Sequence, residues 1–132
     1  MSFLIDTDIC SAYLKNSSAV FSRFVQHSGG LHISIITVGE LRAWTLRAQA
    51  SPTRSRALTD MLANVVVLPV NELVAASFGK LRAEMLDQGQ KSPALDLFIA
   101  ATAQVHGLTV VTHNVRDFVR IPGISVVDWL AP

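Results

Sequence analysis

The sequence predicts a three-layer α/β fold in which a central, mainly parallel β-sheet is flanked by helices. Short apolar, β-branched runs alternate along the chain with longer helical stretches, and this order is typical of β-α-β units with parallel strands. The runs are apolar throughout, as expected when helices cover both faces of a sheet. No internal repeat or low-complexity segment occurs in the 132 residues, so we expect one domain over residues 1–132.

Five segments have the character of strands. They are Phe3–Asp6, Leu31–Ile36, Val65–Leu68, Leu108–Thr112 and Ile124–Val127. The second is β-branched and alternates, and the third is expected to be buried and to end at Pro69.

Six segments between these strands are predicted to be helical. They are Asp8–Leu14, Ser18–His27, a helix from Thr37 through Leu46, Arg54–Ala63, Asn71–Gln88 and Ser92–His106. Thr37 is expected to cap the third helix, with Glu40 three residues on. Ser92 and Pro93 form a favourable start for the sixth helix, which Gly107 is expected to end.

Composition narrows the class of protein. The single cysteine, Cys10, cannot form an internal disulfide, and the N-terminus has no basic region of the kind that precedes a secretion signal. No apolar run is long enough to span a bilayer, so we expect a cytoplasmic protein. Charged residues make up only 16%, which suggests that another chain covers part of the surface. A net charge of +1 taken alone argues against a nucleic-acid-binding protein.

Four of the acidic residues occupy informative places. Asp6, Glu40 and Asp117 fall just beyond the carboxyl end of a predicted strand, and Asp96 lies in the first turn of the sixth helix. Ligands of parallel sheets bind at that edge. Carboxylates gathered there repel one another unless a cation neutralises them, and oxygen ligands select Mg²⁺ or Mn²⁺. A metal-activated water suits the cleavage of a phosphodiester.

Each acid also has a purely structural interpretation. Glu40 can complete a capping box with Thr37, Asp96 can favour the positive end of its helix, and Asp117 can cap a helix. Asp6 is harder to explain in this way, because an acid after Phe-Leu-Ile is costly unless it is used. The structural interpretations leave the shared edge unexplained.

Four short motifs contain these acids and resemble those of PIN domains, most closely of the VapC and FitB toxins. They are Leu4–Asp8, Thr37–Leu41, Asp96–Ala101 and Thr112–Phe118, in family order and across almost the whole chain. The resemblance implies a parallel sheet flanked by helices. It also implies a metal-dependent endoribonuclease, the toxin of a toxin–antitoxin pair.

The resemblance assigns roles to individual residues. Asp6, Glu40, Asp96 and Asp117 would be the catalytic, metal-site acids, with Asp6 and Asp96 the strongest candidates for direct ligation. Glu40 would act through water or orient the nucleophile, and Asp117 would serve a second ion or an outer shell.

Supporting roles fall to three polar residues: Thr7, Thr112 and Asn114. The last two match family positions that hold the acidic loop by hydrogen bonds, although turn chemistry explains them equally well. Asp8 stands where many relatives carry a neutral polar residue. We expect it to cap the first helix, and the alternative is that it adds charge to the site and alters metal affinity.

The resemblance further implies an RNA substrate, transfer RNA being commonest among relatives, together with a cognate antitoxin and a homodimer. The cofactor would be Mg²⁺, with Mn²⁺ as an alternative. Two other functions stay open at this point. One is a PIN-like nuclease that processes RNA or acts on DNA, and the other is a non-enzymatic, flavodoxin-like binding or regulatory domain whose acids are caps.

If four acids bind a metal ion, the rest of the protein carries an excess of positive charge. Of the ten acidic residues, six remain outside the site, against eleven basic ones. Several arginines concentrate in one region: Arg42, Arg47, Arg54 and Arg56. Such residues can bind phosphates, although a solvated helical face is the simpler interpretation of any one of them. Trp44 and Trp129 can stack on bases, but packing explains them more simply.

Overall fold

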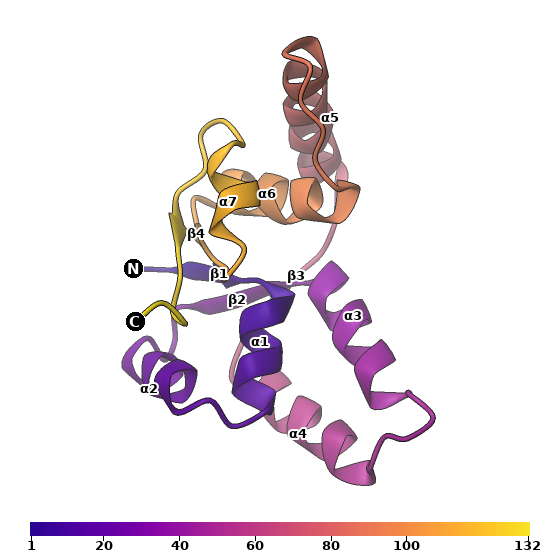
Figure 1. The fold of residues 1–132 in the computed structure, drawn as a ribbon, viewed down its shortest axis with the longest axis vertical. Coiled ribbons are helices and arrows are strands. Elements are labelled where there is room, and N and C mark those ends of the chain that lie inside the picture. Colours follow the sequence, from indigo (N-terminus) through magenta and orange to yellow (C-terminus); the bar gives the residue numbers. More distant parts are fainter.

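A computed structural model describes residues 1–132, and it contains one five-stranded sheet (Figure 1). The strands are β1 (Phe3–Ile5), β2 (Leu31–Ser34), β3 (Val66–Leu68), β4 (Thr109–Val111) and β5 (Val126–Val127). All pairs are parallel, in the order β3-β2-β1-β4-β5. The predicted α/β fold with a central parallel sheet is therefore confirmed.

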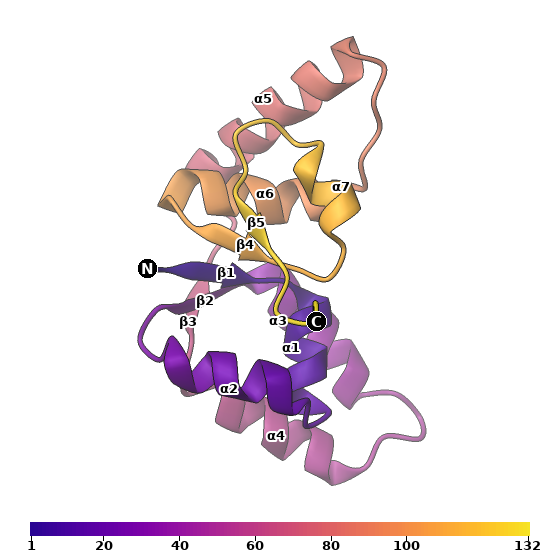
Figure 2. The ribbon, with the colours of Figure 1, turned by 60° about the vertical axis from the view of Figure 1, so that its left-hand side comes forward.

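Seven helices cover the two faces of this sheet. They are α1 (Thr7–Leu14), α2 (Ser18–Gln26), α3 (Ile35–Thr45), α4 (Pro52–Leu62), α5 (Glu72–Asp87), α6 (Ala94–His106) and α7 (Val115–Val119). The first four lie on one face and the last three on the other (Figure 2). Phe3 and Ile5 belong to the first core and Leu4 to the second, because alternate side chains of a strand point to opposite faces.

The third helix begins earlier than the sequence predicts. Ser34 caps α3, and its hydroxyl oxygen accepts a hydrogen bond from the Ile36 N–H at 3.0 Å. Thr37, the predicted cap, is a buried residue inside the helix. The capping-box interpretation of Glu40 is therefore wrong, and Glu40 lies in the body of α3.

The start of α6 also differs from the prediction. Ser92 does not cap the helix, because its hydroxyl donates to the sulfur of Met85 at 3.8 Å, and Pro93 precedes the first helical residue. The predicted end is confirmed: Gly107 adopts a left-handed conformation with φ of 65°. Asp96 lies in the first turn, as expected.

The structure differs from the sequence-based expectation in two further places. The strand expected to be buried is β3, but Val66 is 50% exposed because β3 is an edge strand with β2 as its only neighbour. The short helix α7 was not predicted, since five residues are too few to show a helical period. No helix combines the length and the apolar character needed to cross a membrane.

Candidate functional site

Asp6 lies where β1 ends and α1 begins. One carboxylate oxygen accepts the Thr7 N–H at 2.8 Å and caps the helix, and the other accepts the Thr112 hydroxyl at 2.9 Å. The two residues meet because β1 and β4 are adjacent and Ile5 pairs with Val111 at the carboxyl edge. Sheet order thus brings together side chains that are 106 residues apart in the chain.

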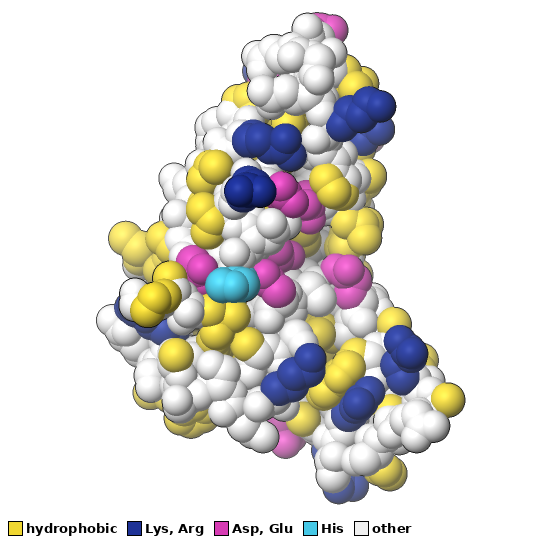
Figure 3. All heavy atoms as spheres, in the orientation of Figure 1, with side chains coloured by type: hydrophobic (Ala, Val, Ile, Leu, Met, Phe, Trp, Pro, Cys, Tyr) yellow, Lys and Arg dark blue, Asp and Glu magenta, His cyan; other side chains and the backbone are white.

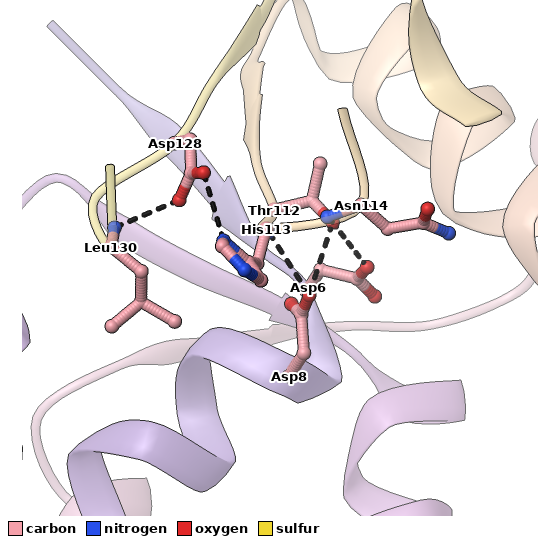
Figure 4. A network of polar contacts seen from close by, with 7 residues as sticks. All are labelled: Asp6, Asp8, Thr112, His113, Asn114, Asp128 and Leu130. Carbon is pink, nitrogen blue, oxygen red and sulfur yellow. Dashed lines mark hydrogen bonds and ion pairs between the residues drawn. The ribbon is translucent and has the colours of Figure 1, made fainter. Parts of the chain in front are cut away.

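Asp8 joins the first turn of α1 to the loop after β4 (Figure 4). Its Oδ2 accepts the backbone N–H of His113 at 2.9 Å and lies 3.4 Å from the Thr112 hydroxyl. Asp8 therefore does not cap the helix as predicted, because Asp6 does so. Its other oxygen, Oδ1, is buried and has no hydrogen-bond partner.

Glu40 reaches the same region from α3. The Thr7 hydroxyl donates to Glu40 Oε1 at 2.6 Å and lies 3.2 Å from the Thr37 hydroxyl. Thr7 therefore ties the start of α1 to α3, and it holds the Glu40 carboxylate on the side of the sheet where Asp6 lies.

Asp117 belongs to α7 and is held by its own loop. Its Oδ2 accepts the Asn114 side-chain amide at 2.8 Å, and its Oδ1 lies 3.6 Å from an Arg120 guanidinium nitrogen. The Asn114 backbone N–H donates in turn to the Thr112 hydroxyl at 3.0 Å. Thr112 thus connects the loop that carries Asp117 with the carboxylate of Asp6.

A single open pocket collects most of these acids. Its lining residues are Asp6, Thr7, Asp8, Ser11, Glu40, Pro93, Ala94, Leu95, Asp96, Ile99 and Asn114. Three of the four predicted acids are therefore brought together, and Asp8 joins them, whereas Asp117 lies outside the lining. No lysine, arginine or histidine lines this pocket.

Three acids of this pocket have raised pKa values. Burial, and then the charge of Asp8, raise the pKa of Asp6 to about 6, although hydrogen bonds from Thr7 and Thr112 oppose the shift. Burial also raises the pKa of Asp8, and the hydrogen bond from His113 opposes it. The pKa of Asp96 is raised by burial and then by the charges of Asp117, Glu40 and Asp8.

These features fit a divalent cation held by few protein ligands. In the present side-chain positions no group of three His, Cys, Asp or Glu residues is arranged to hold an ion. An ion held by all four predicted acids would therefore require side chains to move, because Asp6, Glu40 and Asp117 already have hydrogen-bond partners. Mg²⁺ needs only one or two carboxylates, because water and substrate oxygens complete its coordination. Two features of the pocket favour such a cation: Asp8 Oδ1 has no hydrogen-bond partner, and no basic residue lines the pocket.

Two residues next to this network were not expected from the sequence. His113 Nδ1 lies 2.9 Å from Asp128 Oδ2, and Asp128 Oδ1 accepts the Leu130 N–H at 2.8 Å (Figure 4). The contact joins the C-terminal segment to the loop after β4. Asp128 directly follows β5, so the rule that selected the other acids at strand ends would have found it.

One face of the molecule has most of its acidic side chains in the middle. Figure 3 shows acidic side chains across the middle of one face, with lysine and arginine side chains above and below them. Comparison with Figure 1 places the lower basic group over α3 and α4. An acidic centre between two basic regions suits a polyanion that must approach a cation-loaded site.

Comparisons with known proteins agree with this geometry. A family model described as the PIN domain matches residues 3–124. The chain is 32% identical over 130 residues to the tRNA(fMet)-specific endonuclease VapC of Shigella flexneri, with 98% of each chain covered. It is 34% identical over 131 residues to the protein of the same name from Salmonella typhimurium, again with 98% of each covered.

A solved structure resembles the whole chain as well. The DNA-bound VapBC structure from Salmonella typhimurium contains a chain that superimposes with a TM-score of 0.92 at 32% identity, with 98% of each chain covered. The family model, the sequence identity over nearly the full length and the superposition of the fold all agree. The chain therefore belongs to the PIN-domain family and, within it, to the VapC ribonucleases of toxin–antitoxin systems.

Proposed function

We propose that this protein is a divalent-metal-dependent endoribonuclease that acts as the toxin of a toxin–antitoxin pair, with transfer RNA as its substrate. The observation that carries the proposal is the pocket where Asp6, Asp8, Glu40 and Asp96 converge without any basic residue. Burial, and then the charges of neighbouring carboxylates, raise the pKa values of Asp6 and Asp96, so the folded chain gains from a cation at this place.

Asp6 and Asp96 are the proposed ligands of Mg²⁺ or Mn²⁺. When bound, such an ion supplies charge stabilisation for a phosphodiester and a more acidic water. Glu40, held by the Thr7 hydroxyl, would orient the attacking water by accepting a hydrogen bond from it. Thr112, bonded to Asp6, and Asn114, bonded to Asp117, would fix the loop around the site. Asp117 would act on Asp96 through its negative charge.

The choice of RNA, and of transfer RNA in particular, rests on the relatives. Two of them, 32% and 34% identical, are named tRNA(fMet)-specific endonucleases. Similar solved structures are VapBC assemblies, and one is described as a member of the VapBC family of toxin–antitoxin systems. By the same likeness we propose a cognate antitoxin for this chain. The low share of charged residues supports a second copy of the chain as a further partner, and we propose a homodimer on that ground.

Cleavage of labelled RNA by the purified protein tests the proposal. Wild-type protein should cut transfer RNA with Mg²⁺ or Mn²⁺ and lose activity in a chelator. Asp96→Asn should lower the rate by at least about a hundredfold, because the proposed ligand is lost. The matched control is Asp87→Asn, which removes an exposed carboxylate at the end of α5.

The outcomes separate the candidate functions. Cleavage of DNA and not of RNA would contradict the ribonuclease assignment. Equal rates for Asp96→Asn and Asp87→Asn, or full activity in the chelator, would contradict the metal site.

A further inference from the structure

A second hollow lies next to the acidic pocket and has the opposite charge. It is lined by Lys15, Trp44, Arg47, Ala48, Gln49 and Arg54. We propose that this hollow, the basic hollow, binds a nucleotide of the RNA strand next to the phosphodiester that is cut. The proposal deepens the proposed function and rests on it for the identity of the strand.

The basic hollow continues the acidic pocket along the same two helices. Ser11 of α1 and Glu40 of α3 line the acidic pocket. Four residues further along the chain, Lys15, which caps the C-terminal end of α1, and Trp44 of α3 line the basic hollow. Residues four apart share a helix face and lie about 6 Å apart along its axis, so the hollows follow one another between α1 and α3. Figure 1 shows both helices starting at the sheet edge and running away from it.

The cations of the basic hollow have no counter-ion in the protein. The ion pairs of the chain are His113 with Asp128 and Arg120 with Asp117, and neither involves a residue of this hollow. Lys15, Arg47 and Arg54 are therefore unpaired charges around one concave surface. Such an arrangement attracts an anion, and a phosphate of a strand that passes through the acidic pocket is the nearest one.

Trp44 and Arg54 add a flat surface to this charge. The guanidinium carbon of Arg54 lies 4.9 Å from the centre of the Trp44 ring, and Arg54 Nη1 donates to the Trp44 backbone carbonyl at 2.9 Å. The hydrogen bond fixes the guanidinium against the indole. Bases of single-stranded RNA stack on aromatic rings and on guanidinium planes. A site for phosphate alone would not need this stacked pair, so the hollow suits a whole nucleotide.

Binding of a fluorescent single-stranded RNA oligonucleotide, measured by anisotropy without divalent metal, tests the inference. The test variant is Lys15→Gln/Arg47→Gln, and the control variant is Arg23→Gln/Lys80→Gln, which removes two exposed charges outside both hollows. The slope of log affinity against log salt should become shallower by about 1.4 in the test variant, since each phosphate contact in single strands contributes about 0.7. The control should keep the wild-type slope.

A third variant tests stacking. Trp44→Leu should weaken binding about fivefold or more, the effect of losing one base stack, while Phe78→Leu on α5 serves as its aromatic control. Thermal unfolding of each variant checks that the fold is retained. Should Trp44→Leu fail to fold, the charge variants decide alone, because Lys15 and Arg47 are exposed.

Cleavage kinetics separate this inference from the proposed function. Lys15→Gln/Arg47→Gln should raise KM and keep kcat, whereas Asp96→Asn should lower kcat. If wild type cuts no RNA but the salt slope still falls in the test variant, the proposed function fails and the basic hollow stands. Equal salt slopes and equal KM values for test and control variants would overturn the inference, whatever the cleavage activity.

Discussion

Replacing Asp6 with asparagine is expected to stabilise the folded protein at neutral pH when no divalent metal is present. The Asp6 carboxylate is largely buried and lies beside Asp8, and both conditions disfavour its charge. Asparagine has nearly the same shape, and its oxygen can still accept the Thr7 N–H that caps α1. The Thr112 hydroxyl loses its acceptor on residue 6 but retains Asp8 Oδ2 at 3.4 Å.

The size of the effect follows from proton affinity. The pKa of Asp6 rises from 3.8 to about 6 on folding, which corresponds to about 3 kcal/mol. The folded state binds this proton more tightly than the unfolded chain does. The contribution of Asp6 to the free energy of unfolding is therefore most favourable below about pH 4 and is lost as the pH rises through about 6. The lost hydrogen bond offsets about 1 kcal/mol, so Asp6→Asn should gain about 2 kcal/mol at pH 7.5.

Urea denaturation in a chelator at several pH values between 4 and 8 measures this directly. The free energy of unfolding of Asp6→Asn should depend less on pH than that of the wild type, and the two curves should cross toward the acidic end, where only the lost hydrogen bond separates the two proteins. Asp87→Asn, which removes an exposed acid, should follow the wild type. A variant less stable than wild type at pH 7.5, with an unchanged pH dependence, would show that Asp6 is ionised without cost in the fold.

Two further perturbations have defined outcomes. Thr112→Val keeps the side-chain shape but removes the hydroxyl that donates to Asp6 and accepts from the Asn114 N–H, so we expect a loss of about 1–3 kcal/mol in urea denaturation; an unchanged midpoint would mean that water replaces these bonds without loss. Cys10 is fully buried, and burial together with the charges of Asp6 and Asp8 raises the pKa of its thiol. A maleimide should therefore label it only at the rate of unfolding, and rapid labelling of the folded protein would contradict its burial.

Much of the fold could be predicted from local patterns in the sequence. Apolar runs and helical periods gave all five strands and six of the seven helices, with most ends within about two residues. The errors arise where two neighbouring residues could each begin or end the same helix. Ser34 and Thr37 are both good caps, and the structure uses Ser34, where β2 ends.

The candidate site was predictable where a residue follows a strand. Asp6 satisfies this rule, and Asp96 lies in the first turn of its helix as predicted. Asp128 satisfies the same rule, but its contact with His113 is not visible in the sequence, where His113 is only a histidine in a turn. The position of Asp117 outside the pocket lining depends on α7, which the sequence did not predict.

The sequence by itself determined the family, the alternation of strands and helices, and the acids that stand where strands end, because each of these is a property of neighbouring residues. The tertiary structure alone decided which of them meet. The strand order β3-β2-β1-β4-β5 places the ends of β1 and β4 side by side, so Thr112 bonds to Asp6 and the loop after β4 to Asp8. The contact of α1 with α3 likewise sets an acidic pocket beside a basic hollow, since no local pattern fixes the distance between helices separated in the chain.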